Sequence, residues 1–276
     1  MSELKFQDRN LIEPYDGTDS TEHFRGDLLA PWPNRIRDGR YSIDNREFQL
    51  PINEKDRNNA LHGLINGLNW RVRDKTTSEV VLTATLPACD FYPSTLQLLV
   101  RYQLNKDGLT WSLAAKNIGT EKAPYGASIH PYLVAQPDEH VDDWVLTLPA
   151  DTVLDVDEER LLPLDLLPVA EKNFDFKKGA LIHQRLIDHA FKVESSALER
   201  RVDVRAKNGR GVRMEFDRSS PWIQIHTSDR IGERSNRTCL AVEPMSCPPD
   251  AFNSGIDLIW LQPGDKHQMT WKICAI

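Results

Sequence analysis

The feature that most limits how this chain can fold is a series of short runs of β-type residues separated by turn signals. Long amphipathic helical patterns are missing, and only 180–191 could hold a short helix, with apolar residues that fit a helical period in part. The runs lie at 80–86, 96–104, 109–115, 144–148, 201–206, 212–216, 222–226, 256–261 and 269–273. So many short strands in series indicate a β-sandwich or a barrel.

Two turn segments join neighbouring runs in a way that is typical of hairpins. Residues 207–211 read Lys-Asn-Gly-Arg-Gly, and residues 262–265 read Gln-Pro-Gly-Asp between the last two runs. At 276 residues the chain could form one large all-β domain or two smaller ones. Because no segment has the composition of a linker, we predict a single domain over residues 1–276.

Charge and composition exclude several classes of function. The 34 Lys and Arg residues are outnumbered by 41 Asp and Glu residues, and the net charge of −7 argues against binding to nucleic acid or to an anionic membrane. No apolar run is long enough to span a membrane, and the charged N-terminal segment is unlike a secretory signal, so a cytoplasmic location is expected. The four cysteines lack C-x-x-C spacing, so free thiols are expected.

One carboxylate stands where a strand-type run meets a proline. The apolar run 240–242 is followed by Glu243 and Pro244, which predicts that strand pairing stops there. The prolines at 248 and 249, with Asn-Ser-Gly at 253–255, predict a long non-helical loop. A stiff loop would hold the carboxylate in one orientation, as a general base or a ligand of a sugar hydroxyl requires. A solvated acid at a strand terminus is the alternative.

Four further segments carry polar side chains in punctuated surroundings. Arg35 follows two prolines, which suits either a positioned guanidinium or a surface turn. His62 precedes a glycine, and His130 precedes a proline and the aromatic Tyr132, so both histidines are expected outside regular helices. Asp188 lies among apolar residues and must be paired structurally or hold a ligand hydroxyl.

Taken together, these segments resemble the aldose 1-epimerase (galactose mutarotase) family in both order and spacing. The motifs that carry the resemblance are Asn34-Arg35-Ile36 with Gly39-Arg40-Tyr41, Asn59-x-Leu61-His62-Gly63, His130-Pro131-Tyr132, Asp188-His189-x-Phe191, and Val242-Glu243-Pro244 with Asp250-Ala251-Phe252-Asn253. The resemblance covers nearly the whole chain. It implies an all-β fold, a large antiparallel β-sandwich (the galactose mutarotase-like supersandwich), whose open cleft binds a monosaccharide.

The resemblance also implies an isomerase that interconverts the α and β anomers of a monosaccharide such as glucose or galactose. This reaction needs only a base at the anomeric hydroxyl and an acid at the ring oxygen, so no cofactor and no metal are expected. The implied proton handlers are Glu243, ionised at neutral pH, as base, His130 as acid, and His62 as a helper at the ring oxygen. The implied sugar-binding residues are Asn34, Arg35, Trp70, Tyr132 and Asp188.

Other readings of the same residues stay open. A hexose 6-phosphate mutarotase would need a phosphate site, for which Arg37, Arg40 and Arg71 are candidates. A glycoside hydrolase could use Asp188 and Glu243 as its acid pair, and a non-catalytic sugar-binding module would need neither acid nor base. The histidines lack H-x-x-x-H or H-E-x-x-H spacing, which disfavours a metal site. Either a monomer or a homodimer is compatible with the sequence.

Overall fold

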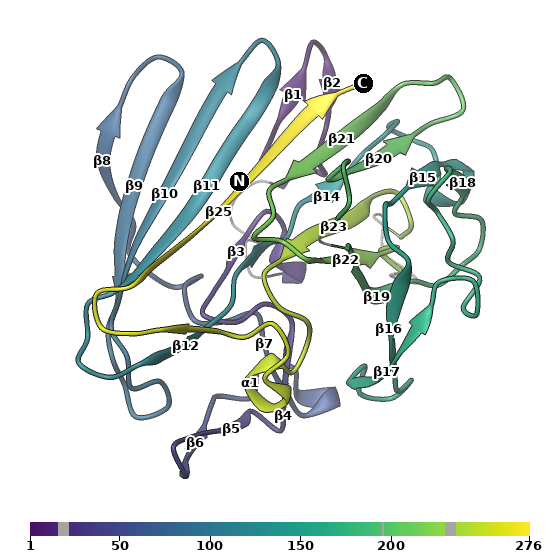
Figure 1. Cartoon of the computed structure of the whole chain (residues 1–276). Helices are drawn as coiled ribbons and strands as arrows, with labels where there is room; N and C mark the ends of the chain where they lie inside the picture. The colour runs from purple at the N-terminus through teal and green to yellow at the C-terminus, as the bar shows by residue number, and fades with distance from the viewer. Residues whose placement is uncertain (16–21, 195, 230–235) are drawn as a thin grey trace.

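The computed structural model describes residues 1–15, 22–194, 196–229 and 236–276 and is built almost wholly of β-strands (Figure 1). Its helical elements are single turns: η1 (Glu22–Phe24), η2 (Lys55–Arg57), η3 (Val141–Asp143) and α1 (Ala251–Ser254). Among the described residues no helix is long and apolar enough to cross a membrane. The prediction of an all-β fold made of large antiparallel sheets is confirmed.

The larger sheet has nine strands, which follow one another from β8 at one edge to β18 at the other (Figure 1). Its order is β18 (Ala180–Leu181), β15 (Val145–Thr147), β20 (Arg201–Arg205), β21 (Gly211–Phe216), β25 (Lys266–Ala275), β11 (Gly108–Asn117), β10 (Leu96–Asn105), β9 (Glu79–Leu86) and β8 (Arg71–Lys75). Its ladders are antiparallel. The three long central strands pair over most of their length.

Strict alternation explains why the centre of this sheet forms where it does. Along β11 every second residue is buried, as a strand with one face on the core requires. Trp111 on β11 pairs directly with Trp271 on β25, and their ring centroids lie 6.1 Å apart. This aromatic cross-strand pair fixes the register in the core, since a slip by one residue would expose both indoles.

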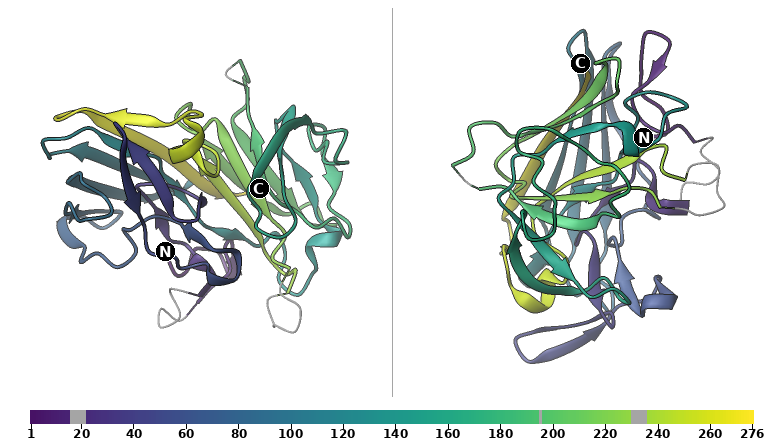
Figure 2. Two further views of the ribbon diagram at one scale, coloured as in Figure 1. Left: turned by 90° about the horizontal axis from the view of Figure 1, so that it is seen from below. Right: turned by 90° about the vertical axis from the view of Figure 1, so that its right-hand side faces the viewer.

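A second sheet of six strands carries the candidate site. Its order is β14 (Tyr132–Leu133), β23 (Leu240–Met245), β22 (Trp222–His226), β19 (Asp188–Lys192), β16 (Thr152–Val156) and β17 (Pro163–Pro168). Figure 2 shows the same arrangement from below and from the side.

The two faces of the six-stranded sheet are used differently. Val242, Ile223 and Phe191 point into the main hydrophobic core, which also holds the inward residues of the nine-stranded sheet. The opposite face carries Trp222 and Met245, which belong to a separate small cluster of buried side chains. Because one core joins both sheets, we expect a single unfolding transition, and that measurement remains the test of the one-domain prediction.

Short two-stranded ladders complete the described part of the fold and bring loops to the site. They are β1 (Lys5–Phe6) with β2 (Arg9–Asn10), β3 (Leu28–Leu29) with β13 (Ser128–Ile129), β4 (Arg35–Arg37) with β7 (Asn59–Leu61), β5 (Arg40–Ile43) with β6 (Arg46–Gln49), and β12 (Ala123–Tyr125) with β24 (Ile259–Leu261). The β4–β7 ladder is the one that matters most for the site, because it places Arg35 opposite Leu61 and next to His62.

Several local predictions can be compared with this structure. The hairpin at 207–211 is confirmed, since it joins β20 to β21 in an antiparallel ladder. The turn at 262–265 exists, but the hairpin is wrong: β24 pairs with β12, and β25 pairs with β11 and β21. The helix predicted at 180–191 is also wrong, because β18 and β19 occupy that segment and pair into different sheets.

The segment after the candidate base differs from the prediction in two ways. The loop at 248–255 is not wholly non-helical, because α1 forms one turn that ends at Gly255, where φ is 73°. Strand pairing does not stop at Glu243 either, since β23 runs on through Pro244 to Met245 beside β22. Beyond Ala241 the ladder to β14 has ended, so Pro244 occupies an edge position, where a missing N–H is tolerated.

Candidate active site

A cavity of about 430 Å³ opens over the six-stranded sheet, a volume suited to a small ligand. Its lining residues come from loops and from the strands β4, β7, β14, β19, β22 and β23: His23, Phe24, Asn34, Arg35, Arg57, Leu61, His62, His130, Tyr132, Asp188, His226, Asp229 and Glu243. All the site residues predicted from sequence lie here except Trp70.

Trp70 does not reach this cavity. It is half-buried at a separate cavity of about 180 Å³, together with Asp27, Ile65 and Asn66. The chain turns after Ile65, whose carbonyl accepts the N–H of Leu68, and then enters the edge of the nine-stranded sheet. Closeness to His62 in sequence therefore does not bring the indole to the site.

The floor of the cavity is set by the register of four strands. Tyr132 pairs with Ala241, Ala241 with His226, and His226 with Asp188, so these four residues form one row across β14, β23, β22 and β19, here called the cavity row. Residues that pair across a sheet point to the same face. The small side chain of Ala241 is fully buried, so Tyr132, His226 and Asp188 are the members of the cavity row that line the cavity.

Glu243 stands one step further along β23, on the same face as the cavity row. It pairs with Gln224 on β22 and is 2% exposed. Burial raises the pKa of Glu243 well above its usual value of 4.5, and the nearby Asp188 raises it further, while Arg35 opposes both effects. The His130 Nε2 atom lies 3.3 Å from the Glu243 Oε1 atom, so the two predicted proton handlers face each other.

His130 is held by its backbone as well as by its ring. Its N–H donates to the carbonyl of Asp27 at 2.9 Å, and its carbonyl accepts the N–H of Gly26 at 2.8 Å. Its ring stacks on Tyr132, with centroids 4.9 Å apart and planes at 29°. Tyr132, predicted to bind the sugar, thus also forms the wall that orients the imidazole.

His62 is locked to the loop that carries Asn34. The His62 N–H donates to the Asn34 carbonyl at 2.9 Å, and the Asn34 N–H donates to the His62 Nδ1 atom at 3.2 Å. Both residues have positive φ, 56° for Asn34 and 63° for His62, which brings the two loops face to face. Since Nδ1 accepts, the proton of the neutral ring is on Nε2. Burial, His130 and Arg35 all hold the pKa of His62 well below 6.5, so the ring stays neutral.

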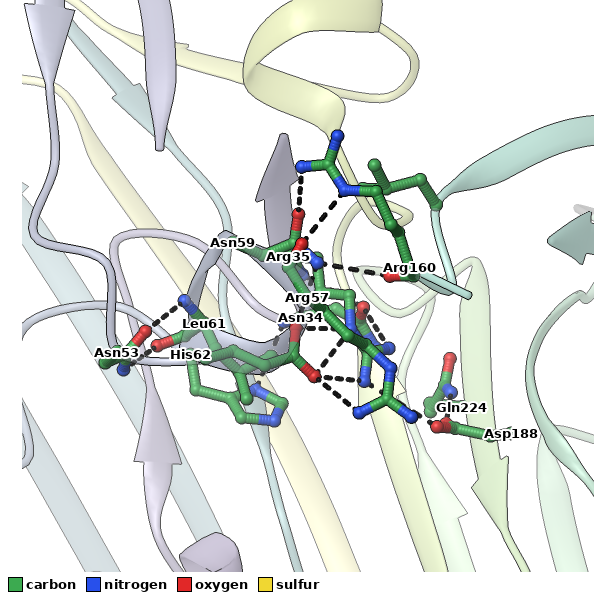
Figure 3. Close-up of polar contacts among 12 residues, drawn as sticks. Asn34, Arg35, Asn53, Arg57, Asn59, Leu61, His62, Arg160, Asp188 and Gln224 are labelled. Atoms are coloured by element: carbon green, nitrogen blue, oxygen red, sulfur yellow. Dashed lines mark hydrogen bonds and ion pairs between the residues drawn. The ribbon is translucent and has the colours of Figure 1, made fainter. Parts of the chain in front are cut away.

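Arg35 is fixed by a buried carboxylate that the sequence analysis did not single out. Its Nε and Nη2 atoms each donate to a different oxygen of Glu54 at 2.9 Å, and its side chain is only 8% exposed. The Arg35 Nη2 atom also lies 3.7 Å from the Asp188 Oδ2 atom (Figure 3). A bidentate arginine of this kind keeps its direction, so the remaining guanidinium N–H groups point at the cavity in a fixed way.

Asp188 remains a carboxylate in this environment. Gln224 donates to its Oδ1 atom at 2.6 Å. Burial alone would raise the pKa of Asp188, but Arg35, His226 and the Gln224 hydrogen bond together bring it below the usual value. Asp188 is therefore suited to accept a hydrogen bond and not to donate a proton.

Asn34 has a different environment from the one expected of a sugar ligand. It lines the cavity, but its Oδ1 atom accepts the Arg35 N–H at 2.9 Å and its side chain is almost fully buried. Its contacts support a positioning role toward Arg35 and His62.

Three donors in the site have spacing that could suit a metal ion. The ligand atoms of His62, His130 and Glu243 lie within 4.8 Å of one another. A histidine that binds a metal through one nitrogen normally donates a hydrogen bond from the other. Here the Nδ1 atom of His62 accepts from the Asn34 N–H, which leaves the proton on Nε2 and disfavours that nitrogen as a ligand.

The sequence analysis missed several residues of the site. His23, Phe24, Arg57, His226 and Asp229 line the cavity, and Glu54 and Gln224 orient charged groups in it. One signal was available: in the predicted strand 222–226, Gln224 and His226 alternate with isoleucines and so share one face. No local pattern marks Glu54, whose partner is 19 residues away.

Comparison with known proteins identifies the family of this chain. The family model described as aldose 1-epimerase matches residues 1–274. The chain is 39% identical over 274 residues to the uncharacterized protein YihR of Escherichia coli strain K12. The aligned region covers 99% of this chain and 86% of that protein. It is 25% identical over 267 residues to the galactose mutarotase of Homo sapiens, with 89% and 77% covered.

A solved structure gives the same picture of the fold. The galactose 1-epimerase from Lactobacillus acidophilus NCFM superposes with a TM-score of 0.81 at 20% identity, over 100% of this chain and 88% of that one. The family model spans almost the whole sequence, and the predicted resemblance is confirmed. The chain belongs to the aldose 1-epimerase family.

Proposed function

We propose that the protein is a mutarotase, which interconverts the α and β anomers of a neutral aldose by opening and closing the pyranose ring. The observation that carries the proposal is the pair formed by Glu243 and His130, whose facing atoms lie 3.3 Å apart in a cavity large enough for one sugar. A base and an acid so close together can act on two oxygens attached to the same carbon.

The proton transfers balance within this pair. In ring opening, Glu243 as carboxylate takes the proton of the anomeric hydroxyl, the bond from C1 to the ring oxygen breaks, and His130 as imidazolium protonates the ring oxygen. The open-chain aldehyde then rotates about the C1–C2 bond. In ring closure His130 takes the proton back from the hydroxyl, and the Glu243 carboxylic acid protonates the carbonyl oxygen on the other face.

The buried position of Glu243 changes one part of the expectation drawn from sequence. A carboxylate in water is ionised at neutral pH without help, whereas burial raises the pKa of Glu243 and lets it hold a proton more firmly. This makes Glu243 a stronger base once it is ionised, and it also allows the protonated form to return its proton on ring closure. We therefore expect activity to rise with pH as Glu243 ionises.

The other residues would hold the sugar and its developing charge. His62 presents a neutral Nε2–H group, which can donate to the ring oxygen without giving up its proton. Arg35, fixed by Glu54, would stabilise negative charge on that oxygen. Asp188, which stays ionised, would accept a hydrogen bond from a ring hydroxyl.

The alternatives fit these contacts less well. None of the arginines considered for a phosphate site lines the cavity: Arg37 pairs with Asp250, Arg40 donates to Gln49, and Arg71 is exposed on β8. A hydrolase needs one carboxylic acid and one carboxylate, and the raised pKa of Glu243 with the lowered pKa of Asp188 would allow that pair, but a hydrolase has no need of the histidine that faces Glu243. Arg57 does line the cavity, so a phosphosugar belongs in the test.

The test is polarimetry of freshly dissolved α-glucose, α-galactose and α-glucose 6-phosphate, with and without the protein. We expect acceleration of the neutral sugars. Glu243→Gln and His130→Asn should each reduce turnover by about 10²-fold or more, while sugar binding, measured by calorimetry, persists. Asp188→Asn should act mainly on apparent affinity.

The matched control is Glu158→Gln, which makes the same change at an exposed glutamate away from the cavity. It should leave the rate unchanged. If no aldose is accelerated while binding is normal, the protein is a binding module. If only the 6-phosphate is accelerated, the proposal of a neutral substrate is wrong.

A further inference from the structure

The cavity row has an asymmetry that the reaction chemistry does not use. Tyr132 and His226 stand on either side of Ala241, two strand positions apart, so their Cα atoms are about 10 Å from each other across the sheet. The Ala241 methyl group between them is fully buried and does not line the cavity. A sugar ring in the cavity can therefore have Tyr132 at one side and His226 at the other.

The ends of the cavity row have different chemistry. Tyr132 contacts His130 at the proton-transfer end, through rings whose centroids are 4.9 Å apart. At the other end His226 pairs with Asp188, the carboxylate held by Gln224 and Arg35. A substrate whose anomeric carbon meets His130 must present the far side of its ring to His226 and Asp188. In a pyranose C4 lies across the ring from C1, and C3 lies across from the ring oxygen.

His226 has hydrogen-bonding capacity that its surroundings do not use. Its Nδ1 atom is buried, and within the described part of the chain no donor or acceptor is in reach of it. A buried polar atom without a partner is uncommon and calls for an explanation. Nδ1 itself has no exposed surface, but His226 lines the cavity, so a hydroxyl bound at the other ring nitrogen would fix which nitrogen carries the proton.

Asp188 and His226 together make a donor–acceptor pair. Asp188 offers its Oδ2 atom, which is 3.7 Å from Arg35 and so lacks a short hydrogen bond there, while Oδ1 is taken by Gln224. A neutral imidazole can donate from one nitrogen. Vicinal hydroxyl groups fit such a pair, since one can donate to the carboxylate while its neighbour accepts from the ring.

We propose that His226, which lines the cavity beside Asp188, is a specificity-determining residue, and that the two residues together bind the hydroxyl groups at C3 and C4 of the aldose. This inference rests on the proposed function, because the direction of the sugar follows from placing C1 at Glu243 and His130. A site built from buried hydrogen-bonding groups discriminates strongly against analogues that lack the matching hydroxyl.

The experiment compares His226→Phe and His226→Asn with the parent protein on glucose, 3-deoxyglucose and 4-deoxyglucose. For glucose we expect kcat/KM to fall by about 3- to 10-fold, mainly through KM, as for loss of one hydrogen bond to a neutral group. For the deoxy sugar that lacks the contacted hydroxyl, kcat/KM of the parent protein should already be lower than for glucose. The two His226 variants should lower that value hardly any further. The glucose-to-galactose preference should also shift, since these sugars differ at C4.

The control is His140→Phe, at an exposed histidine outside the cavity, which should leave all the ratios unchanged. An equal loss on glucose and on both deoxy sugars would mean that His226 is only structural and would overturn the inference. No loss on any sugar would overturn it as well.

Calorimetric binding of glucose and the two deoxy sugars separates this inference from the proposed function. If the parent protein binds glucose but does not speed its mutarotation, the proposed function fails, and the His226 dependence of binding still decides the specificity. If the parent protein is active, but its affinity for sugars changes neither on substitution of His226 nor on removal of the C3 or C4 hydroxyl, the specificity inference alone fails.

Discussion

The pairing of Glu54 with Arg35 allows a quantitative prediction for Glu54→Gln. Glu54 accepts two hydrogen bonds of 2.9 Å from Arg35 and a third of 2.9 Å from the Asn59 Nδ2 atom. The side chains are 8% exposed for Arg35 and 12% exposed for Glu54. Glutamine keeps the shape of the residue but removes its charge, which leaves the Arg35 guanidinium buried with one carboxylate fewer.

Breaking a buried ion pair by removing one partner typically costs about 3–5 kcal/mol. Asp188 lies 3.7 Å from Arg35 and remains to offset part of the charge, and glutamine can still accept one hydrogen bond. We therefore expect a loss of about 2–3 kcal/mol in the free energy of unfolding. For a chain of this size that is a fall in Tm of about 5–10 °C.

The assay is a thermal melt followed by circular dichroism, with Glu121→Gln as the matched control. Glu121 pairs with Arg46 at the surface, where the side chains are 48% and 60% exposed, so its loss should cost less than about 1 kcal/mol. Glu54→Gln should also raise KM, because Arg35 loses the anchor that fixes its direction. A Tm change for Glu54→Gln no larger than that of Glu121→Gln would refute the view that this ion pair stabilises the buried site.

Three further outcomes follow from the same contacts. A raised pKa means that folded Glu243 contributes stability that is fully present below about pH 4.5 and is lost as the pH rises through its folded-state pKa. The Tm of Glu243→Gln should therefore rise relative to that of the parent between about pH 4.5 and the folded-state pKa, and a constant difference across that range would contradict the burial effect. Gly63→Ala should lower both Tm and activity, because the backbone at residue 63 has φ 80° and an added Cβ would lie 2.1 Å from the Ala30 carbonyl oxygen. Gly63 follows His62 directly, so an unchanged Tm would show that the segments around Gly63 and Ala30 can move apart at no cost. Nitrogen NMR at neutral pH should find His62 uncharged and protonated on Nε2, and an Nδ1–H tautomer would rule out the hydrogen bond from the Asn34 N–H.

Some of the site could be predicted from the sequence because its residues stand in segments that cannot be regular structure. The histidines before a glycine and a proline, and the glutamate before a proline, were recognisable as a set only through their order and spacing. Glu54 and His226 had no such marks. Their importance arises from partners that folding brings near, Arg35 for the first and Asp188 for the second.

The same distinction applies to the strands. Alternation in 109–115 and the glycine-rich turn at 207–211 are local signals, and both predicted the structure correctly. The partner of a strand is not a local property, which is why β24 was expected beside β25 and is found beside β12.

The sequence by itself therefore determined the all-β class and most of the strands of the large sheet, since periodicity and turn chemistry act over a few residues, while the proton-handling candidates came from the family resemblance. Only the tertiary structure decided that Trp70 lies apart from the cavity, that Asn34 fixes the proton of His62, and that His226 stands beside Asp188. These features depend on strand register and on burial, and both are set by contacts between residues far apart in the chain.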